Sequence, residues 1–194
     1  LLSRRQRQMC IRDRLLIAFN ILSQMGNVGD SLRHAAFQVA SIMTTTGFAT
    51  TDFDQWPEFS RTLLVMLMFI GACAGSTGGG IKVSRILMYM KTIKKELGIL
   101  IHPRSVKIVM MDGKKLDHPV VRAANIFLIS YAGILVASIL LLTIDNFDFT
   151  TNVTAVISAL NNIGPGLSLV GPAGNFAFFS GFSKYVLMLS LIHI

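Results

Sequence analysis

The chain has 194 residues with a mean hydropathy of +0.59, and 14% of its residues are charged. Soluble domains carry about 25% charged residues, so the composition indicates a membrane protein and argues against a soluble enzyme. The net charge is +8, but ten of the eighteen basic residues lie between Lys82 and Arg122, among apolar segments. This asymmetry follows the positive-inside rule, which places the basic loop in the cytoplasm and argues against nucleic acid as its partner.

The first element expected in chain order is the end of a membrane helix over residues 15–22. Residues 1–14 and 191–194 differ abruptly in composition from the rest, and we interpret both as non-native segments. A short helix follows, capped by Asp30 or Ser31 and ending near Met43. Its roughly 13 residues would extend about 20 Å, whereas the bilayer core is about 30 Å thick. The helix would therefore dip into the membrane and end at a glycine turn, residues 44–48.

The next apolar span begins near Arg61 and is interrupted by a glycine-rich run at residues 75–80, where a helix is disfavoured. Non-helical backbone within a membrane is tolerated only beside protein or a water-filled cavity, so we expect this break to face a pore. After an uncharged span at residues 123–144 the pattern restarts. A short helix at 152–160, capped by Thr150 or Thr151, leads to a second glycine turn at 161–165, and Lys184 opens a last apolar run. Repeats with interrupted helices are typical of transport proteins.

The two glycine turns offer uncharged oxygen atoms, and neither contains Asp or Glu. Carbonyl and hydroxyl oxygens suit K⁺ or Na⁺, whereas a divalent cation would more often recruit carboxylates. A helix cap followed by a tight turn is the structural alternative. A phosphate-binding loop is excluded at residues 75–80, because Gly80 is followed by Ile81 and not by Lys and then Ser or Thr. No nucleophile–base arrangement is present in the sequence, so we predict neither an enzyme nor a covalently bound cofactor.

Three stretches of the chain, residues 37–48, 69–83 and 160–166, resemble the Trk/Ktr potassium-uptake family, and most closely its TrkH-type membrane subunit. His102 and Pro103 in the basic loop also fit this pattern, and the resemblance covers about residues 15–190. It implies an all-α membrane protein of the K⁺ channel-like superfamily, in which four helix–pore loop–helix units share one chain. This sequence would hold the third unit (15–98), a cytoplasmic loop (99–122) and part of the fourth unit (123–190).

The resemblance further implies that the two turns are two of the four strands of a K⁺ selectivity filter. These strands comprise Thr44, Thr45, Thr46, Gly47 and Phe48, and Asn161, Asn162, Ile163, Gly164 and Pro165. K⁺ would be coordinated through Thr45, Thr46, Asn162 and Ile163. A gating loop below the filter would comprise Gly71, Gly75, Ser76, Thr77, Gly78, Gly79, Gly80 and Lys82.

The same resemblance implies a multi-pass homodimer in the bacterial inner membrane, resting on a cytosolic nucleotide-binding regulatory subunit of the TrkA type. The first two units and the end of the final helix are absent from this sequence, so we expect the chain alone not to conduct. The predicted function is potassium uptake. A Na⁺-permeable or Na⁺-coupled relative remains an alternative, because selectivity depends on all four strands, and so does a non-conducting membrane scaffold.

Overall fold

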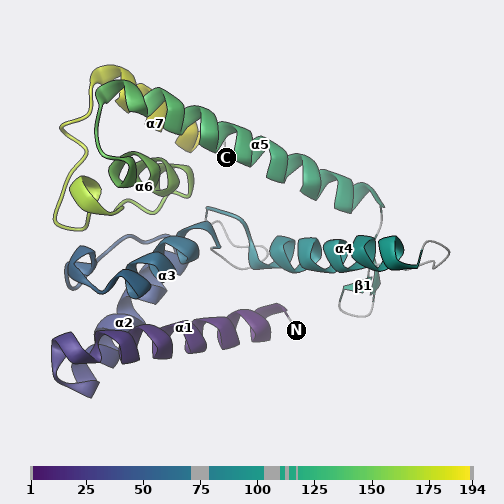
Figure 1. The fold of residues 1–194 in the computed structure, drawn as a ribbon, viewed down its shortest axis with the longest axis horizontal. Coiled ribbons are helices and arrows are strands. Elements are labelled where there is room, and N and C mark those ends of the chain that lie inside the picture. Colours follow the sequence, from purple (N-terminus) through teal and green to yellow (C-terminus); the bar gives the residue numbers. More distant parts are fainter. Residues whose placement is uncertain (1, 71–78, 103–109, 112–113, 117, 193–194) are drawn as a thin grey trace.

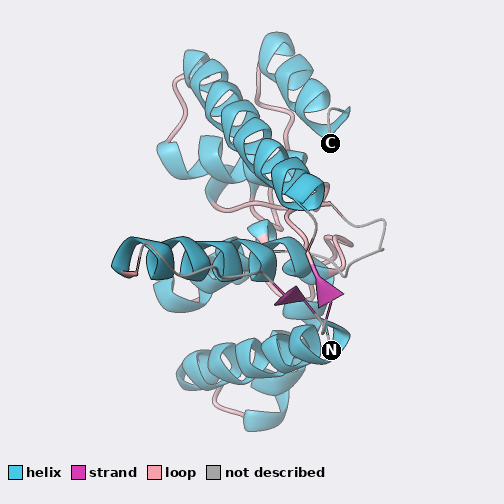
Figure 2. Cartoon of the chain, turned by 90° about the vertical axis from the view of Figure 1, so that its right-hand side faces the viewer, coloured by secondary structure: helices cyan, strands magenta, loops and turns pink. Residues whose placement is uncertain are grey.

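The computed structural model describes residues 2–70, 79–102, 110–111, 114–116 and 118–192. This part of the chain is helical apart from one antiparallel hairpin of two-residue strands, β1 (Met110–Met111) and β2 (Lys114–Lys115), as Figure 2 shows. Its helices are α1 (Leu2–Met25), α2 (Val28–Met43), α3 (Glu58–Phe69), α4 (Val83–Ile101), α5 (His118–Leu142), α6 (Phe149–Leu160) and α7 (Gly181–Ile192). Short 3₁₀ turns lie at Phe53–Gln55, Thr143–Asp145 and Ser168–Val170. The predicted helical class is confirmed.

The helices form two groups that share a core. Helices α1, α2 and α3 pack together, and α5, α6 and α7 form the second group, with α6 lying between α5 and α3 (Figure 1). The core of the first group includes Ile17, Val39 and Leu64, each fully buried. Ile157 and Ile163 from the second group complete the same cluster. Apolar burial therefore holds α6 against α3 and brings the turn after α6 into the cluster that the first group forms.

The caps of the two short helices differ from the sequence expectation. Helix α2 begins after Asn27, whose side-chain oxygen accepts from the Gly29 amide at 3.0 Å, so the prediction of Asp30 or Ser31 as the cap is wrong. Only Gly26 and Asn27 separate α1 from α2, and an acceptor placed this early lets the helix start sooner. Asp30 lies in the first turn, where its negative charge suits the helix dipole.

Helix α6 also starts earlier than expected. The Asp148 carboxylate accepts from the Thr151 amide at 3.0 Å, which makes Asp148 the cap and excludes Thr150 and Thr151 from that role. A carboxylate is a stronger acceptor than a hydroxyl, because a bond to an ionised group is charge-assisted. Both helices end where the sequence predicted, at Met43 and Leu160.

Among the described helices, one is long and apolar enough to cross a membrane, over Pro119–Asp145. Only 17% of its most apolar stretch is buried within the chain, and large apolar side chains such as Ile129 and Leu140 are exposed along it. An apolar surface of this kind fits contact with lipid or with further protein. Helices α3 and α7 have twelve residues each and are too short to span by length alone. A multi-pass topology therefore stays a prediction.

Candidate functional site

Helix α2 ends in a Schellman motif, in which two nested hydrogen bonds close the last turn. The Thr46 amide donates to the Ser41 carbonyl at 2.9 Å, and the Thr45 amide donates to the Ile42 carbonyl at 3.1 Å. Thr45 has a φ of 55°, in the left-handed region that glycine usually occupies at this position. For an L-residue this conformation costs roughly 1–2 kcal/mol, and for a β-branched side chain it is an outlier.

Helix α6 ends with the same hydrogen bonds at the equivalent positions. The Ile163 amide donates to the Ser158 carbonyl at 3.0 Å, and the Asn162 amide donates to the Ala159 carbonyl at 3.1 Å. Asn162 has a φ of 53°, which asparagine tolerates better than threonine does. Helix end, left-handed residue and turn are thus repeated in the two halves of the chain.

The two turns lie against each other. A β-carbon at Gly47 would lie 1.9 Å from the Ile163 carbonyl oxygen and 3.0 Å from Cδ of Pro165. Gly47 also has a φ of 77°, so both its backbone conformation and its neighbour require glycine. Gly164, the equivalent residue of the second turn, has a φ of 112°, and a β-carbon there would meet no described atom of the chain within 4 Å. Among the described residues, the first turn therefore has a close neighbour at this position and the second turn has none.

Two serines tie the turns to their helices, and the sequence interpretation missed both. The Ser41 hydroxyl donates to the Phe48 carbonyl at 2.6 Å, and the Ser158 hydroxyl accepts from the Gly164 amide at 3.0 Å. Each serine precedes its turn glycine by the same interval, Ser41 before Gly47 and Ser158 before Gly164. That repeated spacing was a usable signal.

The remaining side chains of the turns differ in exposure. Thr44, Thr46 and Phe48 are exposed in the first turn, and the Phe48 side chain is 71% exposed. In the second turn Asn162 is exposed, whereas Ile163 is 4% exposed and belongs to the core. Pro165 is half-buried beside Gly47. Ile163 has no polar side-chain atom, so its main-chain oxygen, which approaches Gly47, is the one atom through which it could bind a cation.

Asn161 joins three parts of the fold at the start of the second turn. Its side-chain oxygen accepts a hydrogen bond from the hydroxyl of Tyr131 in α5 at 2.9 Å, and both side chains are buried. A β-carbon at Gly79 would lie 2.2 Å from the Asn161 carbonyl oxygen, and one at Gly80 would lie 3.1 Å from its side-chain oxygen. Sequence reasoning did not find Tyr131, which lies thirty positions before its partner.

The predicted gating residues fall only partly within the described chain. Gly79 and Gly80 lie beside Asn161, and Lys82 directly precedes α4. Ile81 donates its amide to the Phe69 carbonyl at 3.0 Å, so the end of α3 and the start of α4 meet at this point. The other residues of the prediction lie outside the described residues, and these are Gly71, Gly75, Ser76, Thr77 and Gly78.

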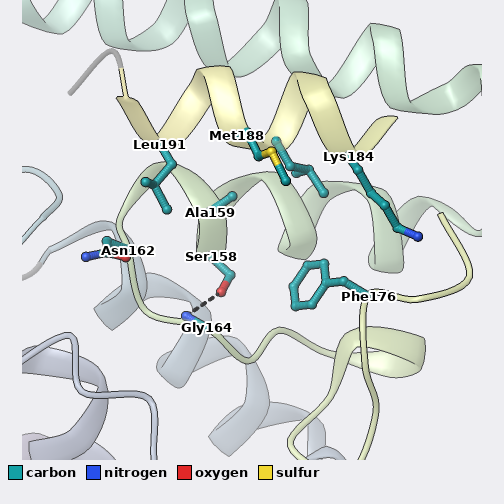
Figure 3. Close-up of a pocket in the computed structure, with 9 residues that line it drawn as sticks. Ser158, Ala159, Asn162, Gly164, Phe176, Lys184, Met188 and Leu191 are labelled. Atoms are coloured by element: carbon teal, nitrogen blue, oxygen red, sulfur yellow. Dashed lines mark hydrogen bonds between the residues drawn. The ribbon is translucent and has the colours of Figure 1, made fainter. Parts of the chain in front are cut away.

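A cavity of about 270 Å³ lies beside the second turn, between α6 and α7 (Figure 3). Figure 3 shows the hydrogen bond between Ser158 and Gly164 at one edge and the Lys184 side chain at the other. The cavity is lined mainly by apolar groups, from Ser158, Ala159, Asn162, Gly164, Phe176, Lys184, Leu187, Met188 and Leu191. In the described part of the chain no three His, Cys, Asp or Glu side chains come together as metal ligands.

The segments that follow the two turns are tied to each other by Asp54. Its carboxylate accepts from the Arg61 guanidinium at 3.0 Å and from the Ser168 amide at 3.1 Å. Further along, hydrogen bonds from the Thr151 hydroxyl and amide hold the pKa of the Asp148 carboxyl below its ordinary value. Both acids are thus part of the scaffold around the turns, and neither lies within a turn.

Residues 16–193 match the sequence model of TrkH, described as a cation transport protein. The chain belongs to the TrkH family. The family match begins two residues after the segment that we interpret as non-native and includes most of residues 191–194.

Relatives within the TrkH family are potassium uptake proteins by name. The Trk system potassium uptake protein TrkH of Salmonella typhimurium is 36% identical over 182 residues, which are 92% of this chain and 37% of the relative. The protein of the same name from Vibrio parahaemolyticus is 42% identical over 163 residues, 84% of this chain and 33% of the relative. The crystal structure of the potassium transporter TrkH from Vibrio parahaemolyticus superposes with a TM-score of 0.87 at 38% identity.

That superposition covers 97% of this chain and 40% of the crystallised protein. The chain thus spans little more than a third of the length of the TrkH relatives that it matches. The resemblance to a TrkH-type membrane subunit is confirmed, and so is the helical fold. The roles of the individual turn residues stay predictions.

Proposed function

We propose that the chain supplies two of the four strands that line the ion path in a Trk-type potassium-uptake membrane subunit. The observation that carries this proposal is the contact between two equivalent turns, in which Gly47 lies against the Ile163 carbonyl. Strands that line one pore must lie next to each other, as these two turns do. The oxygens of Thr45, Thr46, Asn162 and Ile163 would replace the water around K⁺.

The direction of the two short helices supports a cation site. Helices α2 and α6 both end at the turns, so their carboxyl termini face the same region. Each helix end carries the equivalent of about −0.5 elementary charge, which favours a cation without a full negative charge. A site made of dipoles and uncharged oxygens holds a monovalent ion without trapping it.

In this proposal residues 15–98 form the third pore unit, residues 99–122 form the cytoplasmic loop, and residues 123–190 belong to the fourth unit. The glycine-rich segment and Lys82 would act as the gating loop, and Gly79 and Gly80 support this by their contact with Asn161. The protein would work as a homodimer in the inner membrane, and its basic loop would contact a TrkA-type regulatory subunit through charge.

A substitution of Gly47 tests the filter. In the full-length protein that carries this sequence, Gly47→Ser would place a side chain against the Ile163 carbonyl. We expect an altered preference for K⁺ over Na⁺ in the fraction of the protein that assembles, measured as Rb⁺ and Na⁺ uptake into proteoliposomes. Unchanged selectivity would favour the membrane scaffold. Equal uptake of both ions by the unmodified protein would favour the Na⁺-permeable alternative.

A further inference from the structure

Asn161 is held more firmly than its counterpart in the first turn. Its side-chain nitrogen donates to the Ile157 carbonyl at 2.8 Å while its oxygen accepts from Tyr131 at 2.9 Å. A buried amide that is bonded on both sides has one favourable orientation. The counterpart, Thr44, is exposed and bonds back to its own helix at the Ala40 carbonyl, 2.7 Å away. Only the second turn is therefore tied to another helix through this position among the described residues.

The other side of Asn161 is closed by main chain. Gly79 approaches so closely that a β-carbon there would lie 2.2 Å from the Asn161 carbonyl oxygen. Gly80, with a φ of 82°, lies beside the Asn161 side-chain oxygen that accepts from Tyr131. Asn161 is thus enclosed by α5 on one side and by the segment entering α4 on the other.

We infer that Tyr131 is a positioning residue for the second turn, acting through Asn161. The Tyr131 hydroxyl fixes the Asn161 amide against Gly79 and Gly80, and Asn162 follows directly along the chain. Loss of the hydroxyl would leave the buried Asn161 side-chain oxygen without its bond to Tyr131, which is unfavourable. The Asn161 side chain would then rotate, or its backbone would shift, to find another partner. Either response displaces the oxygens of the turn. The inference rests on the proposed function, since it assigns Tyr131 an effect on ion preference.

The test is Tyr131→Phe in the full-length protein, with the ratio of Rb⁺ to Na⁺ uptake in proteoliposomes as the measurement. We expect the ratio to fall by roughly fivefold, the effect of losing one buried hydrogen bond, while assembly stays normal. The matched control is Tyr89→Phe. The Tyr89 hydroxyl also donates to α5, at the Ala124 carbonyl, about two helical turns before Tyr131 and not to a residue of the second turn, so the ratio should not change.

A second variant, Gly164→Ala, distinguishes a failure of the Tyr131 inference from a failure of the proposed function. If Gly164→Ala and Tyr131→Phe both leave the ratio unchanged, the turn is not a filter and the proposed function fails. If Gly164→Ala changes the ratio and Tyr131→Phe does not, only the role of Tyr131 is overturned.

Should Tyr131→Phe fail to assemble, a tyrosine fluorinated beside its hydroxyl is placed at position 131. This side chain is nearly the size of tyrosine and donates more strongly, so the altered hydrogen bond to Asn161 should change the uptake ratio. A ratio equal to that of the unmodified protein would overturn the inference.

Discussion

The ion pair between Asp54 and Arg61 should stabilise the protein far more than the exposed pair of Asp30 and Arg33. Its side chains are only 27% and 21% exposed, and the Asp54 carboxylate also accepts from the Ser168 amide beyond the second turn. A hydrogen bond to a charged group contributes about 1.5–3 kcal/mol, and partial exposure to water reduces this. We expect a coupling free energy of about 1–2 kcal/mol between these two side chains.

The assay is a double-mutant cycle with Asp54→Ala and Arg61→Ala, using chemical unfolding of the purified full-length protein in detergent. The matched control is the pair of Asp30 and Arg33, whose side chains are 45% and 71% exposed at a similar distance of 3.1 Å. That pair should show only about 0.3–0.5 kcal/mol, and added salt should weaken it further. Equal coupling in the two cycles would refute the claim that the less exposed pair of Asp54 and Arg61 is the stronger one.

Three further outcomes follow from single contacts. The pKa of Asp148 is lowered in the folded protein, so the stability that its cap contributes is complete above about pH 4 and is lost as the pH falls through the folded pKa. Melting temperature measured against pH should show this loss, and the Asp148→Asn variant should lack this pH dependence. Gly47→Ala in the full-length protein should reduce Rb⁺ uptake and stability, because a β-carbon there would lie 1.9 Å from the Ile163 carbonyl oxygen, and stability equal to that of the unmodified protein would contradict the contact. Ser138→Ala removes the 2.8 Å bond to Ser190 between α5 and α7 and should cost about 0.6 kcal/mol in a membrane helix pair, which thermal unfolding can measure.

The sequence predicts the two short helices and their turns well because the signals are local. A capped apolar stretch ends at a glycine turn in both halves, and Met43 and Leu160 are the last helical residues in the structure. The starts of these helices were less predictable. Several residues able to accept a hydrogen bond occur in succession near the start of each helix. Which of them becomes the cap depends on where the preceding segment ends, as the turn at Gly26 sets the start of α2.

Contacts between distant segments could not be predicted from the residues. Nothing near Tyr131 in the sequence indicates that its hydroxyl meets Asn161, since the pairing depends on how α5 packs against α6. The approach of Gly47 to Ile163 has the same origin. A glycine in a turn is explained by backbone conformation alone, and only the fold adds the second reason, a carbonyl in the space of a side chain.

Each turn contains one non-glycine residue with left-handed backbone, and in the first turn this conformation is locally unfavourable. Thr45 and Asn162 have nearly the same φ, 55° and 53°, yet asparagine is tolerated there far better than threonine. Thr45 is held in this conformation by the nested bonds of the Schellman motif and by a 2.7 Å bond between the Thr44 and Thr46 hydroxyls. Glycine would relieve the strain but would remove a hydroxyl from the turn. Strain that the surrounding structure sustains is typical of functional sites, so Thr45 itself supports the interpretation of this turn as part of the ion path.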